Sequence, residues 1–267
     1  MKSRQSLSEH CIENSYELAI VMPAFNEEAG ICGAVTSWKD ELTGLGINYR
    51  MILINDGSSD NTGAILDRWA CDPRVLVVHK KNEGHGPTIM AGYRIAVQIA
   101  TWVFQTDSDE EIKPSNFARL WDRRHGYQAL LGIRRRRVQP LIRKVSSMGC
   151  RYSVHLLFGN RVEDVNVPFR LILSSVLGPI VKAIPPLSFA PNVLVSAILS
   201  LSNLRVLNIP VIWEGRKSGT TSLGRIMLLE AIFRAFLQTI LFRLNSGKVV
   251  QVLNGMTSEK INRNNLL

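Results

Sequence analysis

The first half of the sequence alternates short apolar runs with stretches of helical length, and this order constrains the fold more than any other feature. The apolar runs lie at residues 16–23, 49–56, 74–80 and 101–107. The helical stretches between them lie at 27–42, 60–70 and 87–100. Continuous apolar strands that alternate with helices are typical of a parallel sheet covered on both faces. We therefore expect an α/β fold with a mostly parallel sheet.

The second half is less regular and gives a coarser prediction. We expect strands at 125–133 and 204–215 and helices at 140–158 and 222–244, the last of them amphipathic and unusually apolar. The uncharged stretch 183–204 is long enough for a bilayer at ~20 residues, but three prolines favour a short buried helix instead. The remaining boundaries are a polar leader at 1–15, a core domain at 16–221 and a loose tail at 245–267.

Polar side chains follow three of the predicted strands at the point where each strand ends. The sequences there are PAFNEE, NDGSSDNT and TDSDEE. Right-handed crossovers bring the carboxyl ends of parallel strands to one edge of a sheet, and ligands bind in the crevice outside that edge. We therefore expect these three segments to line a cleft.

The acidic segment after the fourth strand predicts a metal site. Asp107 and Asp109 are two residues apart, and Glu111 is two residues further on. If the chain turns there, their oxygens converge on one divalent cation, and hard carboxylates suit Mg²⁺ or Mn²⁺. The alternative is a solvated acidic turn that caps the helix after Pro114.

The other two polar segments fit a nucleotide ligand. Asp56 ends the second strand, where its carboxylate can accept hydrogen bonds from a base or a ribose. The segment NEGHGPT has glycines two residues apart, which permits close approach of backbone to a ligand. Neither GxxxxGK[ST] nor GxGxxG occurs, which argues against nucleoside-triphosphate hydrolysis and nicotinamide chemistry.

Five segments, in order, resemble a known family. VMPAFNEE, INDGSSDNT, KNEGHG, TDSD and DVNVPFRLI are similar to the motifs of the inverting family 2 glycosyltransferases. The resemblance implies a GT-A fold and a nucleotide-diphosphate-sugar donor. Within that family the chain is most similar to the dolichyl- and polyprenyl-phosphate sugar synthases.

The resemblance also implies roles for individual residues. Asp109, Arg134 and Asp164 would be catalytic, and Asp107, Asp109 and Glu111 would hold the metal on the pyrophosphate. The nucleotide-sugar site would comprise Pro23, Ala24, Glu27, Asp56, Gly84, Asp107 and Arg216. The acceptor phosphate would contact Arg134, Arg143, Lys144, Ser147 and Arg170. Two departures from the family pattern are Asn55, in place of an aspartate, and Ser222, in place of a lysine.

Charge distribution favours a phosphorylated acceptor. Between Ser115 and Arg151 there are ten Lys or Arg and one acid, so this block carries nearly all of the formal net charge of +10. From Val165 to Trp213 there is no Asp or Glu. Relatives that glycosylate a hydroxyl carry a catalytic acid there, because a hydroxyl acceptor needs a general base. A phosphate has a second pKa of ~6 and is already an anionic nucleophile near neutral pH.

Two other functions remain open from the sequence. A glycan hydroxyl could be the acceptor, with Asp164 or Glu214 as the base. The arginine-rich block could instead bind nucleic acid, although aromatic residues are sparse there. Four cysteines without a CxxC pair and an N-terminus without an apolar core indicate a cytoplasmic protein. The apolar helix at 222–244 fits packing on the core, on a partner or at a membrane interface, and with a lipid acceptor we expect the protein peripherally on the cytoplasmic face of a membrane or against a membrane partner subunit.

Overall fold

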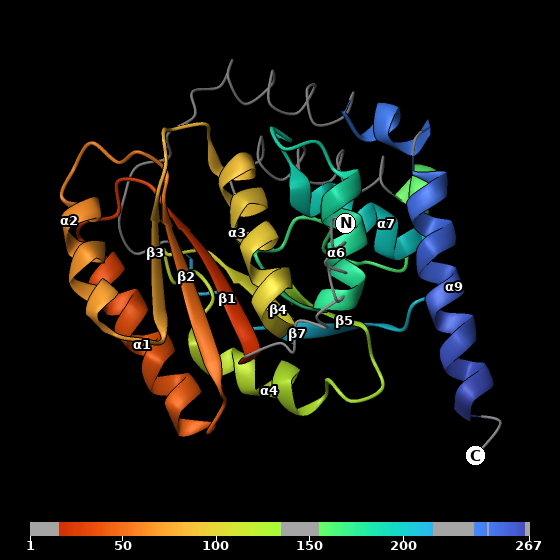
Figure 1. Cartoon of the computed structure of the whole chain (residues 1–267), viewed down its shortest axis with the longest axis horizontal. Helices are drawn as coiled ribbons and strands as arrows, with labels where there is room; N and C mark the ends of the chain where they lie inside the picture. Colours follow the sequence, from red (N-terminus) through yellow and green to blue (C-terminus); the bar gives the residue numbers. More distant parts are fainter. Residues whose placement is uncertain (1–15, 135–154, 216–237, 245, 265–267) are drawn as a thin grey trace, which may run out of the picture.

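The computed structural model describes residues 16–134, 155–215, 238–244 and 246–264. Figure 1 shows a twisted sheet with helices packed on its faces. The strands are β1 Tyr16–Ala24, β2 Tyr49–Asn55, β3 Val75–His79, β4 Ala100–Thr106, β5 Ala129–Arg134, β6 Phe169–Leu173 and β7 Val206–Val211. The helices are α1 Ile31–Gly44, α2 Thr62–Asp67, α3 His85–Ile99, α4 Phe117–Asp122, α6 Ser174–Ala183, α7 Pro191–Leu201 and α9 Gly247–Asn264, with short 3₁₀ turns η1 Arg68–Cys71 and η2 Pro114–Asn116.

The strand order is β3-β2-β1-β4-β6-β5-β7. Strands β1 to β4 are parallel, as the alternation of apolar runs and helices predicts. Strand β6 runs antiparallel to both of its neighbours, and β5 pairs in parallel with β7. The carboxyl ends of every strand except β6 therefore lie at one edge. The order reverses at β1, between β2 and β4, and such a switch point is where open α/β sheets bind ligands.

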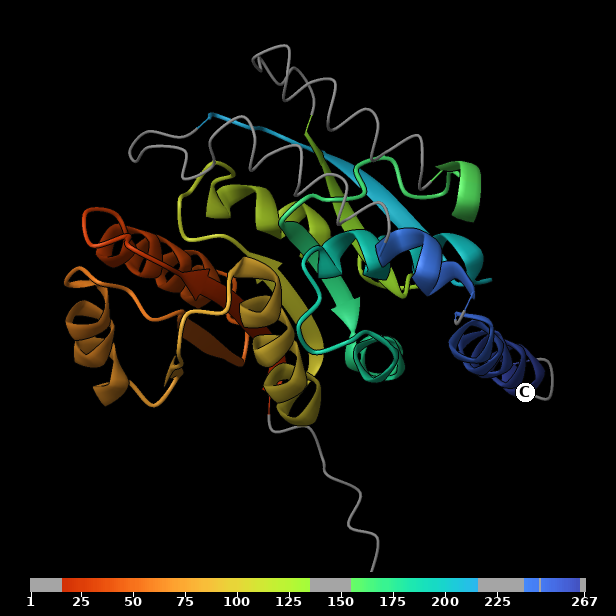
Figure 2. The ribbon, with the colours of Figure 1, turned by 90° about the horizontal axis from the view of Figure 1, so that it is seen from above.

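An aromatic cluster forms the core on one face of the sheet. Trp38 of α1 lies with its ring centroid 5.2 Å from Phe104 of β4, 5.8 Å from Phe117 of α4 and 6.1 Å from Phe169 of β6. Edge-to-face and tilted contacts at these distances stabilise a core beyond simple burial. Helices α1 and α4 therefore cover this face, while α3 and α6 pack on the other (Figure 2).

The face covered by α3 depends on a small residue. A Cβ at Gly92 would lie 2.3 Å from a methyl of Val21 and 2.6 Å from Ile54, so only glycine allows α3 to pack this closely on β1 and β2. This contact fixes the position of the first turn of α3 at the carboxyl edge.

Three parts of the second half differ from the sequence-based expectations. Strand β6 and helix α6 were not predicted, because Arg170 interrupts the short apolar run FRLIL and the dipeptide Gly178-Pro179 is a turn signal inside the helix. The predicted loose tail is wrong: most of it forms α9, which buries Val249 and Leu253 against the domain and contacts α6 and α7. Of the predicted helices at 140–158 and 222–244, only 155–158 and 238–244 lie within the described residues, and both are helical.

Candidate active site

The loops that follow β1 and β2 are hydrogen-bonded to each other at the carboxyl edge of the sheet. Pro23 and Ala24 end β1 in register with Ile54 and Asn55, and the backbone N–H of Asp56 donates to the carbonyl of Ala24 over 3.0 Å. The backbone N–H of Glu27 donates to Thr62 Oγ1 over 2.8 Å. The structure therefore brings Pro23, Ala24, Glu27 and Asp56 together, as predicted for a nucleoside site.

The carboxylate of Asp56 holds the KNEGHG loop in place through hydrogen bonds. It is only 3% exposed, and its Oδ1 accepts hydrogen bonds from Lys80 Nζ (2.7 Å) and the Glu83 N–H (3.1 Å). Its Oδ2 accepts from the N–H of Gly84 over 2.9 Å. Burial would lower the pKa of Lys80, but its contacts with Asp56 and Glu83 outweigh burial and raise it. One buried carboxylate thus fixes the KNEGHG loop, and its remaining lone pairs are what a nucleoside could use.

The acidic segment turns sharply after β4. Glu110 has a φ of 51°, in the left-handed region that non-glycine residues seldom adopt. The turn places Asp109 Oδ1 as acceptor of the Glu111 backbone N–H over 3.2 Å. Asp107 Oδ1 accepts from Gln105 Nε2 over 3.3 Å. Both aspartates are partly exposed at the switch point.

The carboxylate of Glu111 has a hydrogen-bonding partner outside the acidic segment. Its Oε2 accepts a hydrogen bond from Trp213 Nε1 over 2.9 Å, and its backbone carbonyl accepts from the N–H of Glu214. Among the described residues, no group of three or more His, Cys, Asp or Glu is placed to hold a metal ion. Asp107 and Asp109 fit Mg²⁺ or Mn²⁺, which bind through one or two carboxylates plus waters and substrate phosphates. Glu111 does not join them in this arrangement.

His85 is a neighbour of the acidic segment that the sequence did not identify as a site residue. It begins α3, and its Nε2 lies 3.6 Å from Asp107 Oδ1. The next residue, Gly86, packs so closely that a Cβ there would lie 2.1 Å from the carbonyl oxygen of Ser188. The GHG segment therefore serves close packing, which carries His85 to the edge of the site. The signal in the sequence was the pair of glycines that flank this histidine.

A chain of hydrogen bonds between buried polar side chains leads to Asp107. Gln105 donates to Asp107, and its Oε1 accepts from Asn192 Nδ2 over 3.0 Å. Asn192 Oδ1 in turn accepts from the hydroxyl of Tyr93 over 3.4 Å. Asn192 is 3% exposed and lies in SFAPNVLVS, within the stretch that contains no Asp or Glu. At this position the chain has a buried structural amide.

The prediction that Arg170 contacts the acceptor phosphate is wrong. Its side chain is fully buried in β6, and its guanidinium donates to the carbonyls of Val167 (2.8 and 3.0 Å) and Asn192 (3.0 Å). Burial lowers the pKa of Arg170. With no exposed surface, this guanidinium is not accessible to a ligand. Arg170 therefore anchors β6 to α7.

Arg134 and Asp164 meet at the far side of the site. Arg134 ends β5, and Asp164 lies in the loop before β6. Arg134 Nε donates to Oδ2 of Asp164 over 2.8 Å, and Nη2 donates to Oδ1 over 2.9 Å. Burial would lower the pKa of Arg134, but the hydrogen bonds and charge of Asp164 outweigh burial and raise it. The guanidinium is thus kept charged in a fixed orientation.

Within the described residues of the basic block, Arg123 and Arg124 lie apart from Arg134. Helix α4 leads from the carboxyl edge to the amino end of β5, so Arg123 and Arg124 lie at the opposite end of the strands from the acidic segment (Figure 1). Arg124 stacks on Trp121, with 3.9 Å between its guanidinium carbon and the ring centroid. These arginines therefore do not form a single anion-binding face with Arg134. The predicted contacts Arg143, Lys144, Ser147 and Arg216 lie outside the described residues.

The second acid named as a candidate base also has a cationic partner. Glu214 Oε1 lies 2.8 Å from Lys113 Nζ. Ile112 and Trp213 form an isolated antiparallel bridge beside this pair. Residues 111–113, at the end of the acidic segment, therefore contact residues 213 and 214, just after β7.

Comparisons with solved structures confirm the predicted GT-A fold. A glucosyl-3-phosphoglycerate synthase from Mycobacterium tuberculosis superposes with a TM-score of 0.61 at 14% identity, covering 86% of this chain and 82% of that one. The same synthase in complex with Mn²⁺, UDP-glucose and glycerol 3-phosphate gives a TM-score of 0.60 at 16% identity, covering 91% and 86% of the two chains.

Curated relatives lead to the same family. An undecaprenyl-phosphate 4-deoxy-4-formamido-L-arabinose transferase from Pectobacterium atrosepticum is 23% identical over 226 residues, which are 83% of this chain and 67% of that protein. One of the same name from Aeromonas hydrophila is 31% identical over 157 residues, covering 57% of this chain and 48% of that protein. The family model described as glycosyl transferase family 2 matches residues 19–170. Because this match spans more than half of the 267 residues, the chain belongs to glycosyl transferase family 2.

Proposed function

We propose that this glycosyltransferase moves a sugar from a nucleotide-diphosphate donor to a lipid phosphate, such as a polyprenyl phosphate, with inversion at the anomeric carbon. In that reaction an oxygen of the acceptor phosphate attacks the anomeric carbon as the bond to the donor diphosphate breaks. The names of the curated relatives support a polyprenyl-phosphate acceptor, although their identity to this chain is modest.

The observation that carries the proposal is that both acids named as candidate bases are held by cations. Asp164 accepts two hydrogen bonds from Arg134, and Glu214 is paired with Lys113. From Val165 to Trp213, the stretch where the family resemblance implies a catalytic acid in many relatives that act on hydroxyls, this chain has no Asp or Glu. A hydroxyl acceptor would need a general base within hydrogen-bond reach. A phosphate is already ionised, and it instead needs positive charge to approach the negative donor.

We assign the donor to the side of β1, β2 and β4. Glu27 and Asp56 would hold the nucleoside, with Gly84 at the start of α3 beside the diphosphate. Asp107 and Asp109 would hold Mg²⁺ or Mn²⁺, which when bound supplies positive charge to the leaving diphosphate. The solved neighbour that contains Mn²⁺ and UDP-glucose supports a divalent cation. Asp109 would be the carboxylate whose loss is most damaging.

We assign the acceptor phosphate to the side of β5 and β6. Arg134 would donate to it, and Asp164 would hold Arg134 in the orientation that such contact needs. The guanidinium has five donors, of which two are used by Asp164, so donors remain for a phosphate. Arg143, Lys144 and Ser147 would add to this site, and Arg216 would reach the donor.

We further propose that the protein works peripherally at the cytoplasmic face of a membrane. In the described part of the chain no helix is both long and apolar enough to cross a bilayer. Leu156, Leu241 and Leu244 are 87%, 62% and 78% exposed, and their segments touch where Arg243 Nε donates to the carbonyl of Leu157 over 3.0 Å. Apolar side chains next to a cation suit an interface with anionic lipid or with a membrane partner subunit.

Product analysis tests the proposal. The protein is incubated with a radiolabelled nucleotide-sugar, Mn²⁺ and polyprenyl phosphate, after a thermal-shift screen of UDP-, GDP- and dTDP-sugars has identified the donor. The proposal predicts a label that extracts with lipid and is released by mild acid, as expected of a glycosyl phosphate. An acid-stable product formed on a glycan hydroxyl would overturn it.

A further inference from the structure

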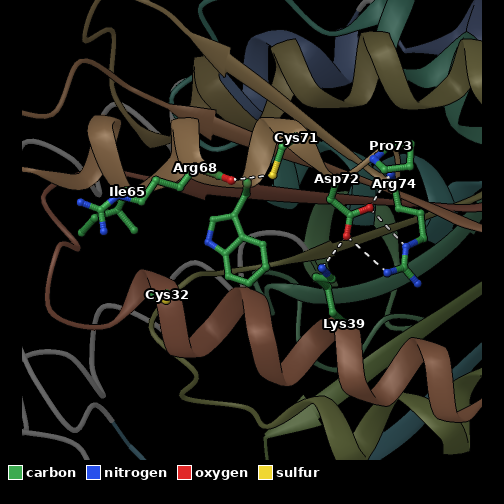
Figure 3. Close-up of a pocket in the computed structure, with 9 residues that line it drawn as sticks. Cys32, Lys39, Ile65, Arg68, Cys71, Asp72, Pro73 and Arg74 are labelled. Carbon is green, nitrogen blue, oxygen red and sulfur yellow. Dashed lines mark hydrogen bonds and ion pairs between the residues drawn. The ribbon is translucent and has the colours of Figure 1, made fainter.

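A cavity of about 800 Å³ lies on the flank of the domain, away from the acidic segment. It opens between α1 and the segment that runs from α2 through η1 to β3, and we call it the flank cavity (Figure 3). Asp72 and Arg74 come just before β3, at the amino end of that strand. Nothing assigned above to donor or acceptor lines it. Its residues are Cys32, Lys39, Ile65, Arg68, Trp69, Cys71, Asp72, Pro73 and Arg74.

The charged end of the flank cavity is built around one carboxylate. Lys39 reaches from α1 to Asp72, and Arg74 donates to both oxygens of Asp72 over 3.3 Å (Figure 3). Burial would raise the pKa of Asp72, but these hydrogen bonds and the charge of Lys39 hold it well below its usual value. The carboxylate therefore stays ionised and keeps both cations at the cavity wall.

The charge of the lining is positive overall. Three cations line the cavity with a single carboxylate: Lys39 and Arg74 contact Asp72, and exposed Arg68 extends toward Ile65 at the other end (Figure 3). Lys39 has three donor hydrogens and uses Asp72 for one contact, so it retains hydrogen-bonding capacity. Partly enclosed cationic groups of this kind attract anions, because the low-dielectric wall strengthens their field.

The rest of the lining is apolar. Ile65, Trp69 and Pro73 contribute carbon surface, and Cys32 and Cys71 contribute two free thiols. Lys39 Nζ lies 4.7 Å from the centroid of the Trp69 ring, so the cationic end and the aromatic wall are adjacent. A cavity of this size with an apolar wall and a few convergent polar groups is typical of a small-molecule site.

We propose that the flank cavity binds a small amphiphilic anion, with its carboxylate, sulfate or phosphate group toward Lys39 and Arg74 and its apolar or aromatic body against Trp69 and Ile65. The head group alone would be bound weakly, since solvent competes for exposed cations. The apolar body alone would leave the cations without a counter-charge. Both parts are required, and this requirement separates the site from the donor site at the carboxyl edge.

The first test is a titration of the full chain with 1-anilinonaphthalene-8-sulfonate, an aromatic anion whose fluorescence rises on binding. The site predicts saturable binding that octyl sulfate, kept below its micelle concentration, displaces at a concentration at least tenfold lower than octyl glucoside. Inorganic phosphate and UDP should not displace it. Displacement by UDP would place the probe in the donor site, and equal displacement by the two octyl compounds would remove the role of charge; either result overturns the proposal.

The second test locates the probe and does not depend on a substitution. Octyl sulfate should slow alkylation of Cys32 and Cys71 by N-ethylmaleimide at least fivefold, measured by peptide mapping, whereas octyl glucoside should not. Arg74→Gln should weaken binding of the sulfonate probe at least fivefold, while Arg94→Gln, on exposed α3 surface, should not. Unprotected thiols, or an Arg74→Gln protein that binds as tightly as wild type, would contradict the assignment.

Discussion

Arg134 at the end of β5 and Asp164 in the loop before β6 form a two-point ion pair, with 2.8 Å between Nε and Oδ2 and 2.9 Å between Nη2 and Oδ1. The two residues are 30 positions apart in the chain, and the strand order places them on the same side of the site. This pairing gives the Asp164 carboxylate a cationic partner and holds the guanidinium of Arg134 in one orientation, which the proposed function assigns to the acceptor phosphate.

Substitution of Arg134 should therefore affect the acceptor and spare the donor. Arg134→Lys keeps the charge but loses the two-point geometry, and we expect kcat/KM for the acceptor to fall about 10–100-fold, equivalent to charge-assisted hydrogen bonds of roughly 1.5–3 kcal/mol. Asp164→Asn should give a similar defect, and the double variant should lose less than the sum. Steady-state kinetics and donor affinity measure this, with Arg94→Lys as the matched control. A loss of donor affinity that accounts for the whole defect would assign Arg134 to the diphosphate.

Asp109→Asn should abolish transfer without unfolding the protein. The amide keeps the size of the side chain but loses the charge that a hard divalent cation requires. Mn²⁺ affinity in the presence of the nucleotide should fall together with turnover, whereas Glu110→Gln, which removes the neighbouring carboxylate, should preserve both. Near-normal turnover of Asp109→Asn at saturating metal would show that the cation is held elsewhere.

Arg170→Met should destabilise the fold instead of weakening substrate binding selectively. The substitution leaves the buried carbonyl of Val167 without its arginine donors and removes one donor from the carbonyl of Asn192, and an unsatisfied buried group costs roughly 1–3 kcal/mol. We expect the free energy of unfolding in urea to fall by about 3 kcal/mol. An unchanged unfolding free energy with a higher KM for the acceptor would restore Arg170 to the phosphate site.

The parallel half of the sheet was predictable because its signals are local. Each strand from β1 to β4 is a continuous apolar run, and the polar residues that follow, such as Asp56 and Asp107, mark where each strand ends. Strand β6 could not be read in this way, because its place between β4 and β5 depends on pairing between distant segments. The burial of Arg170 follows from that pairing, and a sequence pattern does not distinguish a buried arginine from one that binds a ligand.

Two further features could not be predicted from local sequence signals: helix α9 and the pair formed by Glu111 and Trp213. Val249 and Leu253 are spaced by four residues and bury one face of α9, but the surrounding polar residues hide this stripe. The bond between Glu111 and Trp213 joins residues 102 positions apart. The spacing of the acids in the sequence predicted that Glu111 would bind the metal together with Asp107 and Asp109. In the structure its carboxylate instead accepts a hydrogen bond from the indole of Trp213.

Asp72 should make stability depend on pH. Its folded-state pKa is lowered by Lys39 and Arg74, so its contribution is fully present above the unfolded-state value of ~3.9 and is lost as pH falls below it. Asp72→Asn should lower the free energy of unfolding by about 1–2 kcal/mol at pH 7 and by less at pH 3, where the unfolded state has begun to bind the proton and the folded carboxylate has not. Urea denaturation at both pH values measures this, with Asp122→Asn as the control on exposed surface. A difference that is equal at pH 7 and pH 3 would show that ionisation of Asp72 is not involved.

The most direct test of the account compares two acceptors that differ only in the phosphate group. Wild-type protein is assayed with polyprenyl phosphate and with the unphosphorylated polyprenol of the same length, at saturating donor and Mn²⁺, between pH 6 and 8. Because Asp164 and Glu214 are paired with cations and the stretch from Val165 to Trp213 contains no Asp or Glu, we predict kcat/KM at least 100-fold higher for polyprenyl phosphate. Equal use of the two acceptors, or a preference for the polyprenol, would contradict the account.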